Sequence, residues 1–245
     1  MALTERQNDI LKLLKEQKKA EVNELASALY VSEATIRRDL TQMQNMGLIE
    51  RSHGGAILPE NAEEISMFFR MERNANEKER AATKAIPYLP YFQSVFLDSS
   101  STVLALAERI ELKHKTVLTN SLHTALQLSK IPNVNLILLG GSVQFNTNSA
   151  IGSWTARQLK DFSLDLMISS CKAIVGSAAF ESSLDQKEIK RTAFEQCRKH
   201  VLIIDHTKFS AHASYKLNEL SEYDFVATDA PPPEELLKQD IRFIY

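Results

Sequence analysis

Residues 32–58, SEATIRRDLTQMQNMGLIERSHGGAIL, contain the pattern that decides the fold of the first part of this chain. Ser32 is suited to be an N-cap, because its hydroxyl can accept a hydrogen bond from the free amides of a first helical turn. Ile36, Leu40 and Met43 recur at positions i, i+4 and i+7, which places one apolar stripe along a helix. The stretch therefore begins with a predicted helix that packs against a core.

A short β-hairpin is predicted directly after this helix. Gly47 is suited to the left-handed conformation in which many helices end. Two short apolar runs, Leu48-Ile49 and Ala56-Ile57-Leu58, then lie on either side of a polar Gly54-Gly55 turn, as a small hairpin requires. A hairpin in this position is typical of the wing of a winged helix.

Two further helices are predicted before Ser32. Thr4 and Gln7 have the spacing of a capping box at the start of an amphipathic pattern. A second, shorter helix is predicted over about Val22 to Leu29. The tight turn from this helix into Ser32 is typical of a helix-turn-helix, in which the second helix of the pair enters the major groove of DNA.

Four polar side chains of the predicted recognition helix lie off its apolar stripe, namely Thr35, Arg37, Arg38 and Gln42. In that position they could contact a DNA groove. The alternative is an ordinary three-helix unit whose arginine pair is only a solvated face. The wing, the caps and the doubled arginine together favour the DNA-binding interpretation.

The charge of the chain excludes a broadly basic nucleic-acid coat. The formal net charge is -2 and the sequence pI is about 6.3. Basic and acidic residues also balance within residues 1–58. DNA affinity must therefore come from local placement of cations, doubled by dimerisation, which favours a specific regulator over a non-specific binder.

The 245 residues and the hydrophobic content of 44% predict a second domain with its own core. No run approaches the ~20 apolar residues of a membrane span, and the first residues predict an amphipathic helix instead of a signal peptide. Cys171 and Cys197 indicate buried or incidental thiols in a reducing compartment. The histidines lack metal-ligand spacing. We therefore expect a cytoplasmic protein without a metal or cofactor.

We place a linker at residues 59–75, between a DNA-binding domain at 1–58 and a second domain at 76–245. The hinge is expected near Pro59-Glu60-Asn61. Two adjacent phenylalanines, Phe68 and Phe69, are more than a plain linker needs. We expect them to pack on the second domain or on a partner subunit.

The second domain alternates apolar runs with helical patterns, which predicts a Rossmann-like, mostly parallel α/β sheet covered by helices on both faces. The predicted strands are Ser94–Leu97, Thr116–Leu118, Asn135–Leu139, Leu164–Ser169, Val201–Ile204, Phe225–Thr228 and Arg242–Ile244. The predicted helices are Lys78–Ile86, Thr102–Ile110, Leu122–Leu128, Ser153–Lys160, Asp185–Cys197 and Pro232–Lys238. We expect Trp154 to be mostly buried against the sheet.

Small polar residues follow the first three strands, as Asp98-Ser99-Ser100-Ser101-Thr102, Thr119-Asn120-Ser121 and Gly140-Gly141-Ser142. Ligands of open α/β sheets bind beyond the carboxyl ends of the strands. Loops of this kind at helix N-termini expose amides that suit a phosphate. Each cluster alone is explained by helix capping, but three at successive strand ends favour a phosphate site.

A fourth polar cluster, residues 205–209, also follows a strand. Asp205 could accept hydrogen bonds from sugar hydroxyls, and Lys208 could donate to a phosphate. The alternative is a turn that Asp205 caps while Lys208 points to water. Glu188 and Lys190-Arg191 could lie on a helix that faces the cleft, but a solvated charged face is the simpler explanation.

The chain resembles DeoR-family transcriptional regulators over essentially its whole length. Ser32-Glu-Ala-Thr-Ile-Arg-Arg-Asp-Leu40 and His53-Gly-Gly55 are similar to the family's helix and wing signatures. The remainder resembles the family's sugar-phosphate sensor domain, a fold related to ribose-5-phosphate isomerase and glucosamine-6-phosphate deaminase. The matching segments are Asp98–Thr102, Thr119-Asn120-Ser121, Gly140-Gly141, Gly152, Lys190-Arg191 and Asp205–Phe209.

The resemblance implies the site residues. With the face described above, the predicted DNA-binding set is Ser32, Thr35, Arg37, Arg38, Gln42, Arg51 and His53. The effector-binding set is Arg70, Lys78, Asp98, Ser99, Ser101, Thr102, Asn120, Gly141, Asp205 and Lys208. The family usually has glycine where this chain has Ser100, so Ser100 is strained if that position needs a positive φ.

These observations predict a sequence-specific DNA-binding regulator of two domains. It is expected to repress a carbohydrate-utilisation operon, to leave its operator when a phosphorylated sugar binds, and to act as a homodimer or higher homo-oligomer. One alternative is a sugar-phosphate isomerase or deaminase-like enzyme with an appended DNA-binding domain, for which no convincing catalytic dyad aligns. Another is a structural DNA-binding protein without a ligand, which the phosphate loops oppose.

Overall fold

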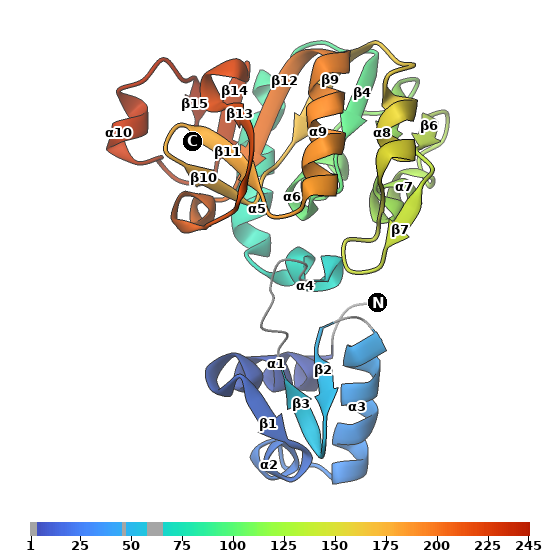
Figure 1. The fold of residues 1–245 in the computed structure, drawn as a ribbon, viewed down its shortest axis with the longest axis vertical. Helices are drawn as coiled ribbons and strands as arrows, with labels where there is room; N and C mark the ends of the chain where they lie inside the picture. Colours follow the sequence, from blue (N-terminus) through green and yellow to red (C-terminus); the bar gives the residue numbers. More distant parts are fainter. Residues whose placement is uncertain (1–3, 46–47, 58–65) are drawn as a thin grey trace. The chain divides into compact units, whose positions relative to one another are not determined.

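Two units make up the chain in the computed structural model, which describes residues 4–45, 48–57 and 66–245 (Figure 1). The first unit is Met1–Phe69 and the second is Arg70–Tyr245. Each has its own hydrophobic core, and each is described by itself.

The first unit contains the three predicted helices, α1 (Glu5–Gln17), α2 (Val22–Ala28) and α3 (Glu33–Asn45). The capping box of α1 is confirmed, since Thr4 and Gln7 each bind the other's backbone amide. Ser32 Oγ accepts from the Thr35 amide at 3.2 Å, as an N-cap does. Ile36, Leu40 and Met43 are fully buried, so the apolar stripe is confirmed. The predicted helix end at Gly47 lies outside the described residues.

The wing is a three-stranded antiparallel sheet with the order β1-β3-β2. Its strands are β2 (Glu50–Ser52) and β3 (Gly55–Ile57), joined through His53-Gly54, and β1 (Lys19–Glu21), which was not predicted. Leu48 and Ile49, predicted as strand, are instead buried core residues before β2. The predicted extension to Leu58 lies outside the described residues.

A glycine pair shapes the wing. Gly54 has a φ of +83°, in the region that disfavours a side chain. Gly55 lies so close to β1 that a Cβ atom would be 2.2 Å from Ala20 O. The third strand can therefore pair only because Gly55 has no side chain.

A short helix, α4 (Met67–Glu72), contains the boundary between the two units, which lies after Phe69. Phe69 packs against the core of the first unit. This differs from the expectation that it would contact the second domain or a partner, since Phe69 is one of four partly buried residues, with Leu13, Leu29 and Val31, that pack against this core.

All seven predicted strands of the second unit form one sheet, in the order β15-β14-β12-β9-β4-β5-β6, and every neighbouring pair is parallel. In chain order they are β4 (Ser94–Leu97), β5 (Thr116–Thr119), β6 (Asn135–Leu138), β9 (Leu164–Ser169), β12 (Cys197–Ile204), β14 (Phe225–Thr228) and β15 (Phe243–Ile244). The helices are α5 (Ala75–Ala85), α6 (Ser101–Ala107), α7 (Leu122–Leu128), α8 (Ser153–Leu159), α9 (Leu184–Gln196) and α10 (Glu234–Leu237). The mixed α/β class and the Rossmann-like parallel sheet are thus confirmed.

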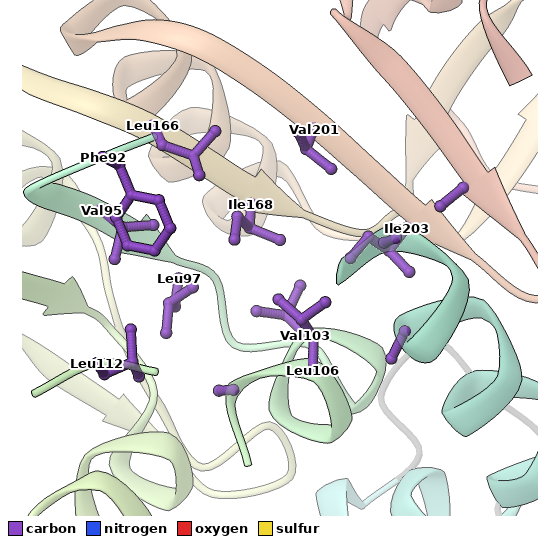
Figure 2. Packing of buried hydrophobic residues seen from close by; sticks show 14 of the residues in the cluster. Phe92, Val95, Leu97, Val103, Leu106, Leu112, Leu166, Ile168, Val201 and Ile203 are labelled. Carbon is purple, nitrogen blue, oxygen red and sulfur yellow. The ribbon is translucent and has the colours of Figure 1, made fainter. Parts of the chain in front are cut away.

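Side chains alternate between the two faces of this sheet. Val95 and Leu97 point into a core shared with α5, α6 and α7, whereas Phe96 packs on the opposite face with α8 and α9. Figure 2 shows the first of these cores, in which Val103 and Leu106 of α6 lie against the strand side chains. Both faces are covered, which is why the strands are continuous apolar runs.

Five short strands of this unit were not predicted. The hairpin of β7 (Ser142–Gln144) and β8 (Ser149–Ile151) follows β6. An antiparallel sheet forms from β10 (Ala173–Val175), β11 (Ala178–Glu181) and β13 (Tyr215–Glu219).

The expectation for Trp154 is wrong, because 62% of this residue is exposed. The buried side of α8 is made by Thr155, Ala156 and Leu159 instead.

Candidate functional site

The recognition helix presents two exposed arginines. Arg37 forms an ion pair of 2.6 Å with Glu33, one turn earlier on α3. Arg38 is exposed and makes no hydrogen bond or ion pair with the described residues. Arg51 of the wing donates to Arg37 O at 3.4 Å, which joins β2 to the helix. The wing and the helix thus present their cations from one connected surface.

The remaining predicted DNA-binding residues differ in their surroundings. Ser32 and His53 are exposed, and Thr35 is half-buried. Gln42 Oε1 accepts from Gln7 Nε2 of α1 at 2.9 Å, beside a buried Asp39 that pairs with Arg6 at 2.5 Å. The amide oxygen of Gln42 therefore serves helix packing.

In the second unit, polar residues follow five neighbouring strands at the carboxyl edge of the parallel sheet, and three of them, Asp98, Asn120 and Asp205, belong to the predicted effector set. From one side to the other, the strand ends lead to Asp229 after β14, Asp205 after β12, Ser170 after β9, Asp98 after β4 and Asn120 after β5. With strands about 4.8 Å apart, Asp205 and Asn120 are separated by about 14 Å along this edge.

Both carboxylate oxygens of Asp98 are bonded to other groups of the protein. Its Oδ1 accepts from the Ser100 amide at 2.9 Å, and its Oδ2 accepts from the Ser170 amide at 3.0 Å and pairs with Lys190 Nζ at 3.0 Å. Lys190 also pairs with Glu181 of β11. Asp98 therefore shapes the loop and has no oxygen free for a ligand.

Lys190 corrects the interpretation of α9 as a solvated charged face, because its side chain is only 6% exposed. Burial by itself lowers the pKa of Lys190, but the Asp98 and Glu181 carboxylates more than offset this and raise the pKa above its ordinary value. The ammonium is therefore charged and joins the ends of β4, β9 and β11.

Ser100 is not strained. Its φ of -84° and ψ of 147° are extended, and its hydroxyl caps α6 by accepting from the Val103 amide at 3.2 Å. Serine is a good residue for this position because a cap needs a side-chain oxygen and no positive φ. Its neighbours Ser99, Ser101 and Thr102 are buried.

Ser99 belongs to a buried polar network that the sequence did not reveal. Its hydroxyl donates to Gln186 Oε1 of α9 at 3.1 Å, and Gln186 Nε2 donates to Ser149 Oγ of β8 at 2.8 Å. Ser149 and Thr147 share a hydrogen bond of 2.7 Å. The network joins the end of β4 to the β7–β8 hairpin.

Asn120 retains an acceptor. Its Nδ2 donates to Ala150 O at 3.1 Å, whereas its buried Oδ1 has no hydrogen-bond partner among the described residues. Gly141, which was predicted to bind the effector, has a structural reason to be glycine, since a Cβ atom there would be 2.0 Å from Thr155 Oγ1. The packing of α8 alone thus requires this glycine.

Asp205 is fully buried, and one of its two carboxylate oxygens accepts no hydrogen bond from the described residues. Its Oδ1 accepts from Thr207 and from Asn74 Nδ2, the latter at 3.4 Å. Its Oδ2 has no hydrogen-bond partner among the described residues and lies 3.9 Å from Lys208 Nζ. Asp205 thus caps its turn with Oδ1, while its buried Oδ2 stays without a hydrogen bond from the described residues.

A concentration of positive charge surrounds this aspartate. Burial and, after it, the positive charges of Lys208, Arg70 and Arg73 together lower the pKa of Lys78 to about 7, although the Asp205 carboxylate acts in the opposite direction. The pKa of Lys172, which follows β9, is lowered first by burial and then by Lys208 and Arg73. Because these cations repel one another, the cluster favours an anion.

Lys172 was missed because its segment matched the family only loosely, although Ser170-Cys171-Lys172 follows a strand as the predicted loops do. Asn74 was missed because its left-handed backbone, with φ 54°, and its contact with Asp205 join residues 131 positions apart.

The described residues show two absences. No group of three or more histidine, cysteine, aspartate or glutamate side chains there could hold a metal ion. No helix of the described ranges is long and apolar enough to cross a membrane.

Comparison with known proteins covers both units. Residues 6–62 match the DeoR-like helix-turn-helix domain, and residues 73–230 match the DeoR C terminal sensor domain. The HTH-type transcriptional regulator GolR of Listeria innocua is 34% identical over 238 residues, which cover 96% of this chain and 94% of that protein. The glycerol-3-phosphate regulon repressor of Escherichia coli is 33% identical over 241 residues, which cover 97% and 95%.

Among solved structures, a ribose 5-phosphate isomerase from Methanocaldococcus jannaschii aligns with 56% of this chain and 55% of its own, at 13% identity and a TM-score of 0.39. A likeness this weak indicates no function. The relatives matched over nearly their full length are regulators of transcription and not enzymes.

Proposed function

This chain belongs to the DeoR family of DNA-binding transcriptional regulators, and from that premise we propose that it represses a carbohydrate-utilisation operon until a phosphorylated sugar releases it. The observation that carries the proposal is the cation cluster around Asp205, which is suited to a phosphate. A neutral sugar would not need so many cations, and a structural DNA-binding protein would need none.

The proposed DNA contacts come from α3 and the wing. Arg37 and Arg38 are exposed on the recognition helix, with Arg51 and His53 on the wing beside it. Ser32 and Thr35 lie at the amino end of the helix, the end that commonly meets base edges. Gln42 is proposed to position α3, because its amide oxygen is bonded to Gln7.

The proposed effector contacts divide by chemistry. Lys78, Lys208 and Arg70, together with Lys172, would hold the phosphate by charge-assisted hydrogen bonds. Asp205 Oδ2 and Asn120 Oδ1, both buried without a hydrogen-bond partner among the described residues, would accept from sugar hydroxyls. Asp98, Ser99, Ser101, Thr102 and Gly141 would shape the floor of the site.

The site also suggests how binding reaches the DNA-binding unit. Lys78 Nζ donates to Arg73 O at 2.6 Å and also to Arg70 O, so it holds the end of α4. Asn74, between α4 and α5, donates to Thr207 Oγ1 at 3.1 Å in the Asp205 loop. A phosphate that draws Lys78 and the Asp205 loop toward itself would therefore move residues 70–74, at the carboxyl end of the proposed linker.

We further propose that the protein is cytoplasmic and acts as a homodimer or higher homo-oligomer, with domains at 1–58 and 76–245 and a linker at 59–75. Two recognition helices about 34 Å apart would fit half-sites separated by one turn of DNA. Effector binding would disfavour that spacing, with a coupling of ~1–3 kcal/mol.

The test is a titration of the operator complex with a panel of sugar phosphates and the matching unphosphorylated sugars. We expect a sugar phosphate to release DNA and its parent sugar to have no effect. Lys208→Ala should bind operator as wild type does but respond weakly, whereas Lys238→Ala, an exposed lysine on another loop, should respond normally. An unaltered response of Lys208→Ala would refute the placement of the phosphate.

A further inference from the structure

An apolar surface lies on the β6 side of the second unit, away from the cation cluster. It consists of Leu126 on α7, Leu138 on β6, Val143 and Phe145 of the β7 hairpin, and Trp154 on α8. Their exposed fractions are 64, 46, 58, 63 and 62%. We call these five residues the hairpin face.

The elements of the hairpin face adjoin one another. β8 pairs with β7 and contacts both α7 and α8, and α7 also contacts β6. Figure 1 shows these elements gathered on one side of the second unit, on the right of the view. The five residues therefore flank the β6 edge of the sheet, with α7 on one face, α8 on the other and the hairpin in contact with both.

The hairpin is held firmly to the unit. The Leu122 amide donates to Asn148 O at 2.9 Å, and the Ala150 amide donates to Asn120 O at 2.8 Å. Gln186 Nε2 donates to Ser149 Oγ at 2.8 Å from α9. A hairpin fixed at these points keeps Val143 and Phe145 in solvent, which costs free energy unless a partner covers them.

The exposed area suits a protein interface. Phe145 and Trp154 together expose roughly 200–300 Å² of apolar surface. The three aliphatic side chains raise the total to about 400 Å². A standard dimer interface takes about 800 Å² from each partner, of which about 65% is apolar in homodimers. The hairpin face therefore supplies most of the apolar core that such an interface needs.

The edge of the sheet indicates what the partner is. β6 is the last strand of the seven-stranded sheet, and its residues Asn135–Leu138 carry no charge or proline to discourage pairing. A two-fold axis beside this edge would bring each copy's hairpin face against its own equivalent, as a closed symmetric dimer requires.

We propose that the hairpin face is the surface through which two copies of this chain associate. The proposal rests on the proposed function, in which two recognition helices bind two half-sites. It places the interface next to Asn120, whose backbone and side chain bind β8, so the effector site and the dimer contact share a strand end.

The test uses sedimentation of the full chain, with Trp154 as an internal reporter because it is the only tryptophan. Wild type should sediment as a dimer or a multiple of it, with Trp154 shielded from acrylamide. Phe145→Glu should halve the mass of the smallest assembly, keep the far-ultraviolet spectrum and expose Trp154 to the quencher. Leu126→Glu, on a different element, should do the same if Phe145→Glu fails to fold.

Leu237→Glu is the control, since Leu237 is also an exposed leucine but lies on α10. A monomeric wild type at high micromolar concentration, or a Phe145→Glu protein that stays dimeric, would overturn the proposal. Release of operator by sugar phosphate is measured separately. If a dimeric wild type is not released from operator by any sugar phosphate, the proposed function fails and the proposed interface stands. If a monomeric wild type is released, the proposed interface fails and the proposed function stands.

Discussion

The neighbouring glycines of the wing should differ in what an added methyl group costs. At Gly54 a Cβ atom would meet nothing within 4 Å, but φ is +83°. At Gly55 the backbone is ordinary for an L residue, but the Cβ atom would lie 2.2 Å from Ala20 O and 2.9 Å from Glu21 Cα. Both contacts are with backbone, which cannot rotate away.

The expected costs follow from these two situations. Gly54→Ala should lower the free energy of unfolding of the first unit by about 1–2 kcal/mol, the cost of a left-handed conformation. Gly55→Ala must push β1 away from β3, which adds the loss of ladder hydrogen bonds to an overpacking cost of ~1–3 kcal/mol. We expect a total of about 3–4 kcal/mol, and each 1 kcal/mol shifts Tm by about 4–8 °C in a unit of this size.

The assay is scanning calorimetry of the full chain, with the transition of the first unit followed separately by amide exchange in α1 and α3. Operator binding is measured below both transitions. Gly54→Ala should bind DNA nearly as wild type does, whereas Gly55→Ala should bind weakly because the displaced β3 moves the wing. Equal stability losses at the two positions would refute the close approach of β1 as the reason for Gly55.

Three further predictions concern other residues. Arg38→Ala, and separately Arg37→Ala, should leave the fold intact and weaken operator binding. The loss should be ~1–3 kcal/mol if the arginine contacts a base, whereas the salt dependence should fall by about one ion if it contacts a phosphate. Wild-type affinity in both variants would exclude α3 as the recognition helix. Because the pKa of Lys78 is about 7 in the free protein and a bound phosphate dianion would raise it, effector binding should take up protons above pH 7 and weaken as the pH rises. Calorimetry in buffers of different ionisation enthalpy measures this uptake, and a Lys78→Met protein that still takes up the same protons would contradict it. Tyr30 is 95% exposed and has a φ of 54°, so its side chain contributes little packing while its backbone has a conformation that favours glycine. Tyr30→Gly should therefore raise the free energy of unfolding by about 0.5–1 kcal/mol. A loss of stability in a denaturant titration would show that the tyrosine makes an unrecognised contact.

The local sequence pattern was sufficient to predict most of the helices and all strands of the parallel sheet. The stripe of Ile36, Leu40 and Met43 predicted α3, because residues spaced by one helical turn lie on one face. The seven strands of the parallel sheet were predicted because strands buried on both faces must be apolar throughout. Helix caps such as Ser32 could also be predicted from the sequence, because a capping side chain binds amides only two or three residues away.

The tertiary structure alone decided which residues meet. β1 is too short and too polar to be recognised, and it exists only because Gly55 lets it approach β3. Trp154 was misplaced because apolar character does not say which side of a short helix is covered. The pairing of Lys190 with Asp98, like that of Asn74 with Asp205, joins residues far apart in the chain, and charge in a sequence does not reveal whether its partner is water or protein. Capping and helical periodicity depend on residues that are close together in the chain, so the sequence was sufficient to predict where the loops lie. A binding site is assembled by the packing of distant strands, so only the tertiary structure shows which side chains of those loops meet.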